Sequence, residues 1–169
     1  MLSKKMQAAL NAQINAELYS AYLYLSMSAH CEAANLTGFA AWMRRQAREE
    51  SQHAMKIFDY VTDRDGRVTL DAVSRPPTTW KSPAQIWERV LEHERHVSKL
   101  INDLYALAVK EKDFPTEAML QWFLTEQVEE EKTARQILEQ VKMLGPSGSA
   151  LFFLDRHVGK DAGEKGEGA

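Results

Sequence analysis

The chain has 169 residues, a formal net charge of −3 and apolar side chains at 44% of its positions. These values fit one domain with a sizeable core, and the mild charge excludes the basic footprint of a nucleic-acid-binding protein. No segment approaches the roughly 20 apolar residues of a membrane span, and the first residues lack the apolar stretch of a signal peptide. The single cysteine, Cys31, excludes an internal disulfide and a cysteine-based metal cluster. We therefore expect a cytoplasmic protein without membrane or nucleic-acid partners.

Two long helices are predicted in the first part of the chain. Apolar side chains recur every three or four residues over residues 3–32 and again over residues 37–63. Thr37 is the expected N-cap of the second helix, and Asp65-Gly66 ends it.

A connection of about 17 residues, 65–81, comes next and is longer than most loops between helices. A crossover that joins two parallel helices along the length of a bundle needs such a span. Ser82, as N-cap, and Pro83, at the first helical position, then begin a third helix predicted over residues 83–112.

Two further helices complete the predicted fold. The fourth runs from the break at residues 113–115 to Leu144, and a short fifth covers residues 147–158. We therefore expect one all-α domain over residues 1–158, a four-helix bundle with a long crossover between helices two and three and a short C-terminal helix. Residues 159–169, rich in glycine and charge, are expected to be a disordered tail.

Each of the four long helices carries acidic side chains on its apolar face, and two of them also carry amide or imidazole side chains there. These residues are Glu17 in the first helix, Gln46, Glu50 and His53 in the second, Glu94 in the third, and Gln127 and Glu130 in the fourth. All lie near the middle of helices that are about 43 Å long at roughly 1.5 Å per residue. If the helix ends are aligned, four carboxylates and one imidazole meet in one layer of the bundle.

Such a gathering of carboxylates needs a countercharge. An unpaired ionised carboxylate in a core costs several kcal/mol, and no Lys or Arg lies on these faces. Two divalent cations would neutralise four carboxylates, and a set of oxygen donors with one nitrogen suits iron better than calcium. Glu50 and His53, three residues apart, share one helical face. The sequence therefore predicts a dinuclear metal site.

Other interpretations compete with this one. A di-iron or di-manganese oxidase acting on a small substrate would need a substrate pocket or a second Glu-x-x-His motif, and the sequence signals neither. A purely structural helical assembly would leave four buried acids without a countercharge. His93 and His96 fall off the face marked by Glu94, so we expect both at the surface.

Three runs carry a resemblance to a known family. They are NAELYSAYLY at residues 15–24, EESQHAMK at residues 49–56 and EQVEEE at residues 126–131. With them, residues 3–158 resemble the non-haem ferritins of bacteria and archaea. The resemblance implies that Glu17, Glu50 and His53 bind a first iron, that Glu50 is shared between two irons, and that Glu94 and Glu130 bind the second.

The same resemblance implies further roles around this pair of irons. Gln127 belongs to the metal site through hydrogen bonds beside the second iron. Tyr24 is a candidate one-electron donor next to the di-iron centre. A third and weaker iron position, which Glu130 also reaches, is implied on the cavity side and is formed by Glu49, Glu126 and Glu129.

The sequence departs from related families in two places. Bacterioferritins carry a second Glu-x-x-His motif on the fourth helix, whereas Gln127 and Glu130 occupy that turn here. The methionine that binds haem is absent, since Ser51 and Gln52 stand between Glu50 and His53. We therefore expect no haem.

The expected function is iron storage with ferroxidase activity. Fe(II) would be oxidised by O2 or peroxide at the di-iron site and stored as Fe(III) mineral. The resemblance implies a hollow shell of twenty-four identical subunits with the fifth helix near a symmetry axis. Glu117, after the turn at residues 113–115, is a candidate pore acid.

Overall fold

The structure is a computed structural model that describes residues 2–145 and 147–164. The described part of the chain forms five helices and follows the predicted all-α architecture. They are α1 (Lys4–Ala33), α2 (Thr37–Asp63), α3 (Pro83–Glu111), α4 (Phe114–Leu144) and α5 (Gly148–Glu164). None of the described helices is both long and apolar enough to cross a membrane.

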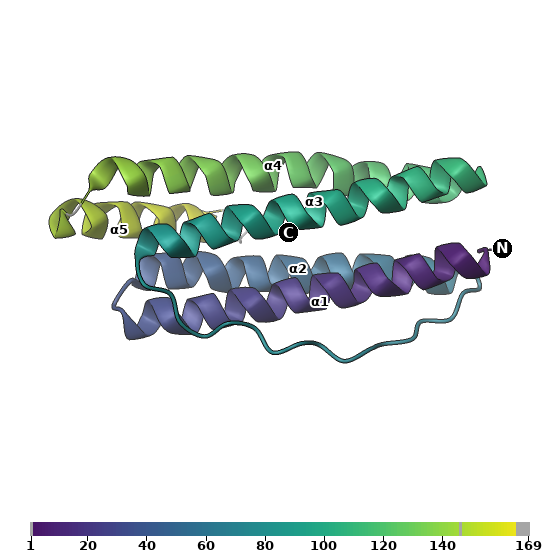
Figure 1. The fold of residues 1–169 in the computed structure, drawn as a ribbon, viewed down its shortest axis with the longest axis horizontal. Coiled ribbons are helices and arrows are strands. Elements are labelled where there is room, and N and C mark those ends of the chain that lie inside the picture. Colours follow the sequence, from purple (N-terminus) through teal and green to yellow (C-terminus); the bar gives the residue numbers. More distant parts are fainter. Residues whose placement is uncertain (1, 146, 165–169) are drawn as a thin grey trace.

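The four long helices form two antiparallel pairs (Figure 1). α1 packs on α2, and α3 packs on α4. The connection between α2 and α3 runs back along the bundle beside α1, so that α2 and α3 point the same way (Figure 1). This arrangement confirms the predicted crossover.

Side chains of α1 hold the crossover in place. Asn11 donates through Nδ2 to the carbonyl of Arg67 at 3.0 Å and accepts from the backbone N–H of Thr69 at 3.1 Å. Nearer the other end, the Ser26 hydroxyl donates to the carbonyl of Pro77 at 2.5 Å. The long connection is therefore an ordered strap whose polar backbone groups find partners on α1.

Of the two helix caps predicted from the sequence, one is confirmed and one is wrong, and Asp113 provides a third cap within the predicted break at residues 113–115. The hydroxyl of Ser82 accepts from the N–H of Gln85 at 3.2 Å at the start of α3. Asp113 accepts from the N–H of Thr116 at the start of α4. Thr37, in contrast, is the first residue of α2, and the prediction that it is the N-cap is wrong: Leu36 occupies the cap position without a side-chain bond.

A residue of α5 caps α2 instead. The buried carboxylate of Asp155 accepts from the N–H of Gly38 at 2.9 Å and from that of Phe39 at 2.8 Å. These N–H groups belong to the first turn, where a helix has no internal acceptors and where its dipole favours an anion. A local sequence signal could not reveal a cap supplied from more than 110 positions away.

The fifth helix is longer than predicted. It extends to Glu164, six residues beyond the expected boundary at residue 158, and residues 165–169 of the expected tail lie outside the described residues. Gly159 lies within α5, at a point where this helix passes very close to α2. A Cβ on Gly159 would lie 2.7 Å from the Cα of Gly38. The glycine permits this close approach.

The core consists of two apolar clusters stacked along the bundle. One cluster contains Leu23, Met43, Trp87 and Leu138, and α5 adds Leu154 and Val158 to it. The other contains Leu10, Ile57, Ile101 and Phe123. On each long helix a gap separates the residues of one cluster from those of the other, and the predicted carboxylates, His53 and Gln127 fall in that gap, whereas Tyr24 belongs to the first cluster.

Candidate metal centre

The layer between the two apolar clusters is polar and buried. It contains Glu17 from α1, Glu50 and His53 from α2, Glu94 from α3, and Gln127 and Glu130 from α4, each less than a tenth exposed. The middle turns of the four long helices lie at the same depth in the bundle, as expected for helices with aligned ends. The convergence predicted from the helical spacing is observed, while metal binding by these residues stays a prediction.

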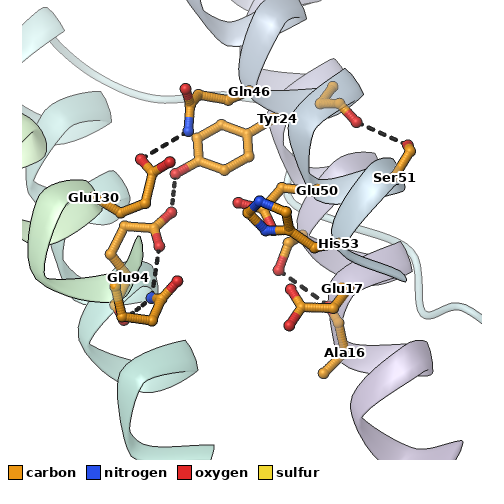
Figure 2. Close-up of polar contacts among 12 residues, drawn as sticks. Ala16, Glu17, Tyr24, Gln46, Glu50, Ser51, His53, Glu94 and Glu130 are labelled. Atoms are coloured by element: carbon orange, nitrogen blue, oxygen red, sulfur yellow. Dashed lines mark hydrogen bonds and ion pairs between the residues drawn. The ribbon is translucent and has the colours of Figure 1, made fainter. Parts of the chain in front are cut away.

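Glu17, Glu50 and His53 form the compact part of this layer (Figure 2). One potential ligand atom from each lies within 4.8 Å of the other two. His53 Nδ1 is 3.3 Å from Glu50 Oε2, as expected for residues one helical turn apart. Among the described residues, no other group of three or more His, Cys, Asp or Glu side chains comes this close together.

Glu94 and Glu130 face this group from the α3–α4 side (Figure 2). The hydroxyl of Tyr24 and Nε2 of Gln127 both donate to the carboxylate of Glu94, the latter at 3.2 Å. Gln46 Nε2 donates to Glu130 Oε2 at 2.9 Å. The second pair of acids therefore shares the layer but is held by its own hydrogen-bond donors, outside the compact group.

Burial raises the pKa of all four carboxyl groups. It raises the pKa of Glu94 to about 7 and, with the charge of Glu94, that of Glu130 to about 8. The pKa of Glu50 lies well above its usual value because of burial and the charges of Glu94 and Glu17. Burial also raises the pKa of Glu17, against the opposing bond from Gln13. Without a cation, the layer therefore retains protons near neutral pH.

His53 is a neutral imidazole at neutral pH. Burial, with a smaller contribution from the positive charge of Lys56, lowers its pKa to about 4. The ring packs edge-on against Trp122, with centroids 5.2 Å apart. A neutral imidazole held in one orientation offers a lone pair to a metal ion.

The compact group has the properties of a cation site. Within the described part of the chain, Glu17 Oε2 and Glu50 Oε2 are buried and accept no hydrogen bond of good geometry, although His53 Nδ1 lies 3.3 Å from Glu50 Oε2. A buried acceptor without a donor is unfavourable, and a bound cation would satisfy both oxygens. Carboxylate oxygens with one imidazole nitrogen suit iron and similar divalent transition metals.

The acids expected at a third iron position are less buried. Glu49 and Glu126 are half-buried and Glu129 is exposed. Glu49 Oε1 lies 3.7 Å from Nε of Arg45, and the charges of Glu49 and Glu126 contribute to the raised pKa of Glu130. The structure does not gather these three acids into one compact group of ligand atoms.

His93 is buried, so the prediction that it lies at the surface is wrong. Its Nε2 lies 2.8 Å from the hydroxyl oxygen of Ser20, and its ring packs against Tyr19 and Tyr24. The buried face of α3 is wider than its apolar stripe because α1 packs beside it. His96, one turn later, is exposed as expected.

One residue beside the site escaped the sequence reasoning. Gln13 is buried, and its Nε2 donates to Glu17 Oε1 at 2.8 Å. The sequence contains a signal for this contact, because Gln13 and Glu17 are polar residues four positions apart on the apolar face of one helix.

Comparisons with known proteins identify the family of the chain. Residues 7–144 match the family described as Ferritin-like domain. The chain is 45% identical over 160 residues to a bacterial non-heme ferritin of Bacteroides fragilis, covering 95% of this chain and 99% of that protein. A bacterial non-heme ferritin of Campylobacter jejuni is 40% identical, with 94% and 95% covered.

Solved structures give the same result at the level of the fold. An open pore ferritin from the archaeon Archaeoglobus fulgidus superimposes with a TM-score of 0.93 at 51% sequence identity, covering 94% of this chain and 98% of that one. The family match spans the four long helices, and the similarity to individual relatives includes most of the chain. The chain therefore belongs to the ferritin family.

Proposed function

We propose that this iron-storage protein is a ferroxidase whose substrate, Fe(II), binds in the polar layer at mid-bundle. The observation that supports the proposal most is the pair of buried carboxylate oxygens, on Glu17 and Glu50, that accept no hydrogen bond of good geometry within the described residues. With the imidazole of His53 beside them, they form a preformed set of ligand atoms for a first Fe(II) ion.

A second Fe(II) ion would bind between the two helix pairs. Glu94 and Glu130 would supply its carboxylates, Glu50 would be shared between both ions, and Gln127 would keep Glu94 oriented through its hydrogen bond. Four carboxylates balance the charge of two divalent ions, and they also stabilise the additional positive charge that oxidation creates. The protons held by Glu94 and Glu130 near neutral pH would leave as the ions bind.

The oxidation itself transfers one electron from each ion. With O2 as the oxidant, two Fe(II) and two protons give two Fe(III) and one H2O2; with peroxide, the same two electrons and two protons give two molecules of water. Fe(III) would then move to the store as a hydrous oxide. Tyr24, whose hydroxyl donates to Glu94, would be a one-electron donor beside the centre, able to pass one further electron to the oxidant.

A third iron position belongs to the same proposal. Glu49, Glu126 and Glu129 would bind this iron weakly, and Glu130 would contribute from the edge of the layer. The charges of Glu49 and Glu126 contribute to the raised pKa of Glu130, which supports placing these two acids near the edge of the layer.

Assembly into a shell of twenty-four copies in the cytoplasm completes the proposal. The side chains of Phe152 and Phe153 on α5 are 58% and 72% exposed, whereas Leu154 beside them is buried against the bundle. Two adjacent exposed phenylalanines are unfavourable in water and fit a contact between subunits. Light scattering at neutral pH and moderate salt should give a particle of that size; a monomer would contradict this part.

The ferroxidase proposal is tested by removing two ligands of the compact group together. In the Glu50→Ala/His53→Ala variant, the initial rate of Fe(II) oxidation in stopped-flow absorbance should fall by more than about 100-fold. The matched control is Glu92→Ala/His96→Ala, which removes the same residue types from exposed positions on α3. Unchanged oxidation in the first variant would end the proposal.

A further inference from the structure

Three buried glutamine amides each donate a hydrogen bond to a different carboxylate of the layer. The bonds are Gln13 to Glu17 at 2.8 Å, Gln46 to Glu130 at 2.9 Å and Gln127 to Glu94 at 3.2 Å. The family resemblance accounts for Gln127 only. Gln13 and Gln46 remain without a role, although each is almost completely buried in a layer where a polar side chain requires a partner.

The two remaining amides serve opposite sides of the layer. Gln13 lies on α1, one turn before Glu17, and therefore acts within its own helix. Gln46 lies on α2, one turn before Glu50, but its amide reaches across the bundle to Glu130 on α4 (Figure 2). The compact half of the layer thus has its own amide donor, and so does the half formed by α3 and α4.

We propose that Gln13 and Gln46 are positioning residues, one for each half of the metal centre: Gln13 fixes the carboxylate of Glu17, and Gln46 that of Glu130. The inference rests on the proposed ferroxidase function and assigns a separate determinant of affinity to each metal position. In each carboxylate the amide engages one oxygen and restricts rotation, and the other oxygen is left for the cation.

The physical reason is the usual effect of a partner behind a metal ligand. A hydrogen bond to the far side of a ligand fixes its orientation and stabilises its charged form, and losing such a partner typically weakens metal affinity by about 10- to 100-fold. Because Glu17 and Glu130 lie on different helix pairs, losing one amide should weaken one metal position and leave the other nearly unchanged.

Co(II) is a suitable probe because it binds similar ligands and is not oxidised by air during the titration. Gln13→Met and Gln46→Met keep an unbranched side chain of similar length but remove the donor. In the assembled protein, stepwise binding is followed by the visible absorption of Co(II) and by calorimetry. The matched control is Gln140→Met, at an exposed position of α4 away from the centre.

The two variants should differ from each other in a defined way. The wild type and Gln140→Met should bind two Co(II) ions per chain at the centre. Gln13→Met should weaken the position formed by Glu17, Glu50 and His53 by about 10- to 100-fold, and Gln46→Met should weaken the other position by a similar factor. If Gln13 and Gln46 had only a structural role, the two substitutions would change thermal stability without weakening one metal position more than the other.

Three results would overturn the inference: unchanged affinity at both positions in the two variants, equal weakening of both positions by either variant, or fewer than two Co(II) ions at the centre of the wild type. A different result would contradict the ferroxidase proposal and leave the positioning roles intact. If the wild type oxidises Fe(II) slowly while the two Co(II) positions respond as expected, the positioning roles stand and the oxidation does not.

Discussion

The buried carboxylates set the balance between protons and metal ions at the centre. Glu94 and Glu130 titrate near pH 4.5 when fully hydrated, but burial raises their pKa to about 7 and about 8. In the metal-free protein, protons therefore provide much of the countercharge that the apolar surroundings require. In the proposed function, metal ions would replace these protons, so we expect metal binding to depend on pH.

The first prediction concerns the stability of the metal-free protein. A carboxyl group whose pKa is higher in the folded chain than in the unfolded chain stabilises the folded state. This stabilisation is complete at pH values below the pKa of the unfolded chain, and it is lost as the pH rises through the pKa of the folded chain. For Glu94 and Glu130 the window runs from about 4.5 to about 8. Below about pH 6.5 the lowered pKa values of His53 and His93 have the opposite effect. The free energy of unfolding, measured by urea denaturation, should therefore fall from about pH 6.5 to pH 9, on the order of a few kcal/mol.

Zn(II) provides the complementary measurement, since it binds without redox chemistry. Its stabilising effect should be larger at pH 8 than at pH 6, because fewer protons compete for the carboxylates. In the Glu94→Gln/Glu130→Gln variant, the pH dependence of the metal-free protein should be flatter. A metal-free protein that becomes more stable between pH 6.5 and pH 9 would contradict this account of the charge of the layer.

The second prediction concerns Tyr24. Its hydroxyl donates to Glu94 and favours the ionised carboxylate, so Tyr24→Phe should raise the pKa of Glu94 further above 7. Co(II) titrations at several pH values should then show the second position filling only at higher pH. Tyr19→Phe, a nearby partly buried tyrosine, is the control; an equal shift in both variants would assign the effect to packing.

Single residues of the site could be predicted from the sequence where the helical period was strong. The four glutamates, His53 and Gln127 stood on apolar faces at matched depth, and the structure buries all of them. His93 could not be placed in this way, because its burial depends on how closely α1 and α3 approach. Gln46 was on the expected face, but its partner on α4 requires the packing of two helix pairs.

At the scale of helices, α5 is anchored to the bundle by one carboxylate and two glycines. Asp155 accepts from the first-turn N–H groups of Gly38 and Phe39, and Gly159 passes close to the backbone of Gly38. A Cβ on Gly38 would lie 1.8 Å from the carbonyl oxygen of Asp155. The start of α2 and the position of α5 therefore depend on each other.

The third prediction tests this anchor. Asp155→Ala leaves two N–H groups of α2 without an acceptor, which costs about 2–4 kcal/mol in total. Hydrogen exchange measured by mass spectrometry should become at least about 10-fold faster in α5 and in the first turn of α2, because each 1.4 kcal/mol lost from local stability speeds exchange about tenfold. Arg156→Ala, at an exposed neighbouring position, should leave exchange unchanged. Equal protection in both variants would contradict an anchoring role for Asp155.

Helix boundaries were predicted well where the signals are local. Ser82 with Pro83 and Asp113 with Pro115 mark the starts of α3 and α4, since a cap and a proline act within one turn. The start of α2 and the extent of α5 were predicted less well. Both depend on a contact between residues 38 and 155–159, which no local pattern encodes.

For the whole molecule, the arrangement of two apolar clusters with a polar layer between them is the main result. The clusters supply the hydrophobic stabilisation of the bundle, and the aligned helices hold the layer rigidly between them. Ligands held on packed helices would keep fixed positions, which would favour the proposed binding and oxidation of successive Fe(II) ions. The exposed phenylalanines of α5 lie outside the layer, so the proposed subunit contact and the proposed oxidation site belong to separate parts of the chain.

The proposed function depends above all on the binding of two iron ions in the polar layer. Crystals of the protein soaked with Fe(II) without oxygen, and measured at the iron absorption edge, should show two anomalous peaks per chain within the layer. One peak should contact Glu17, Glu50 and His53, and the other Glu94 and Glu130. Iron bound only at surface acids, with no peak in the layer, would contradict the account.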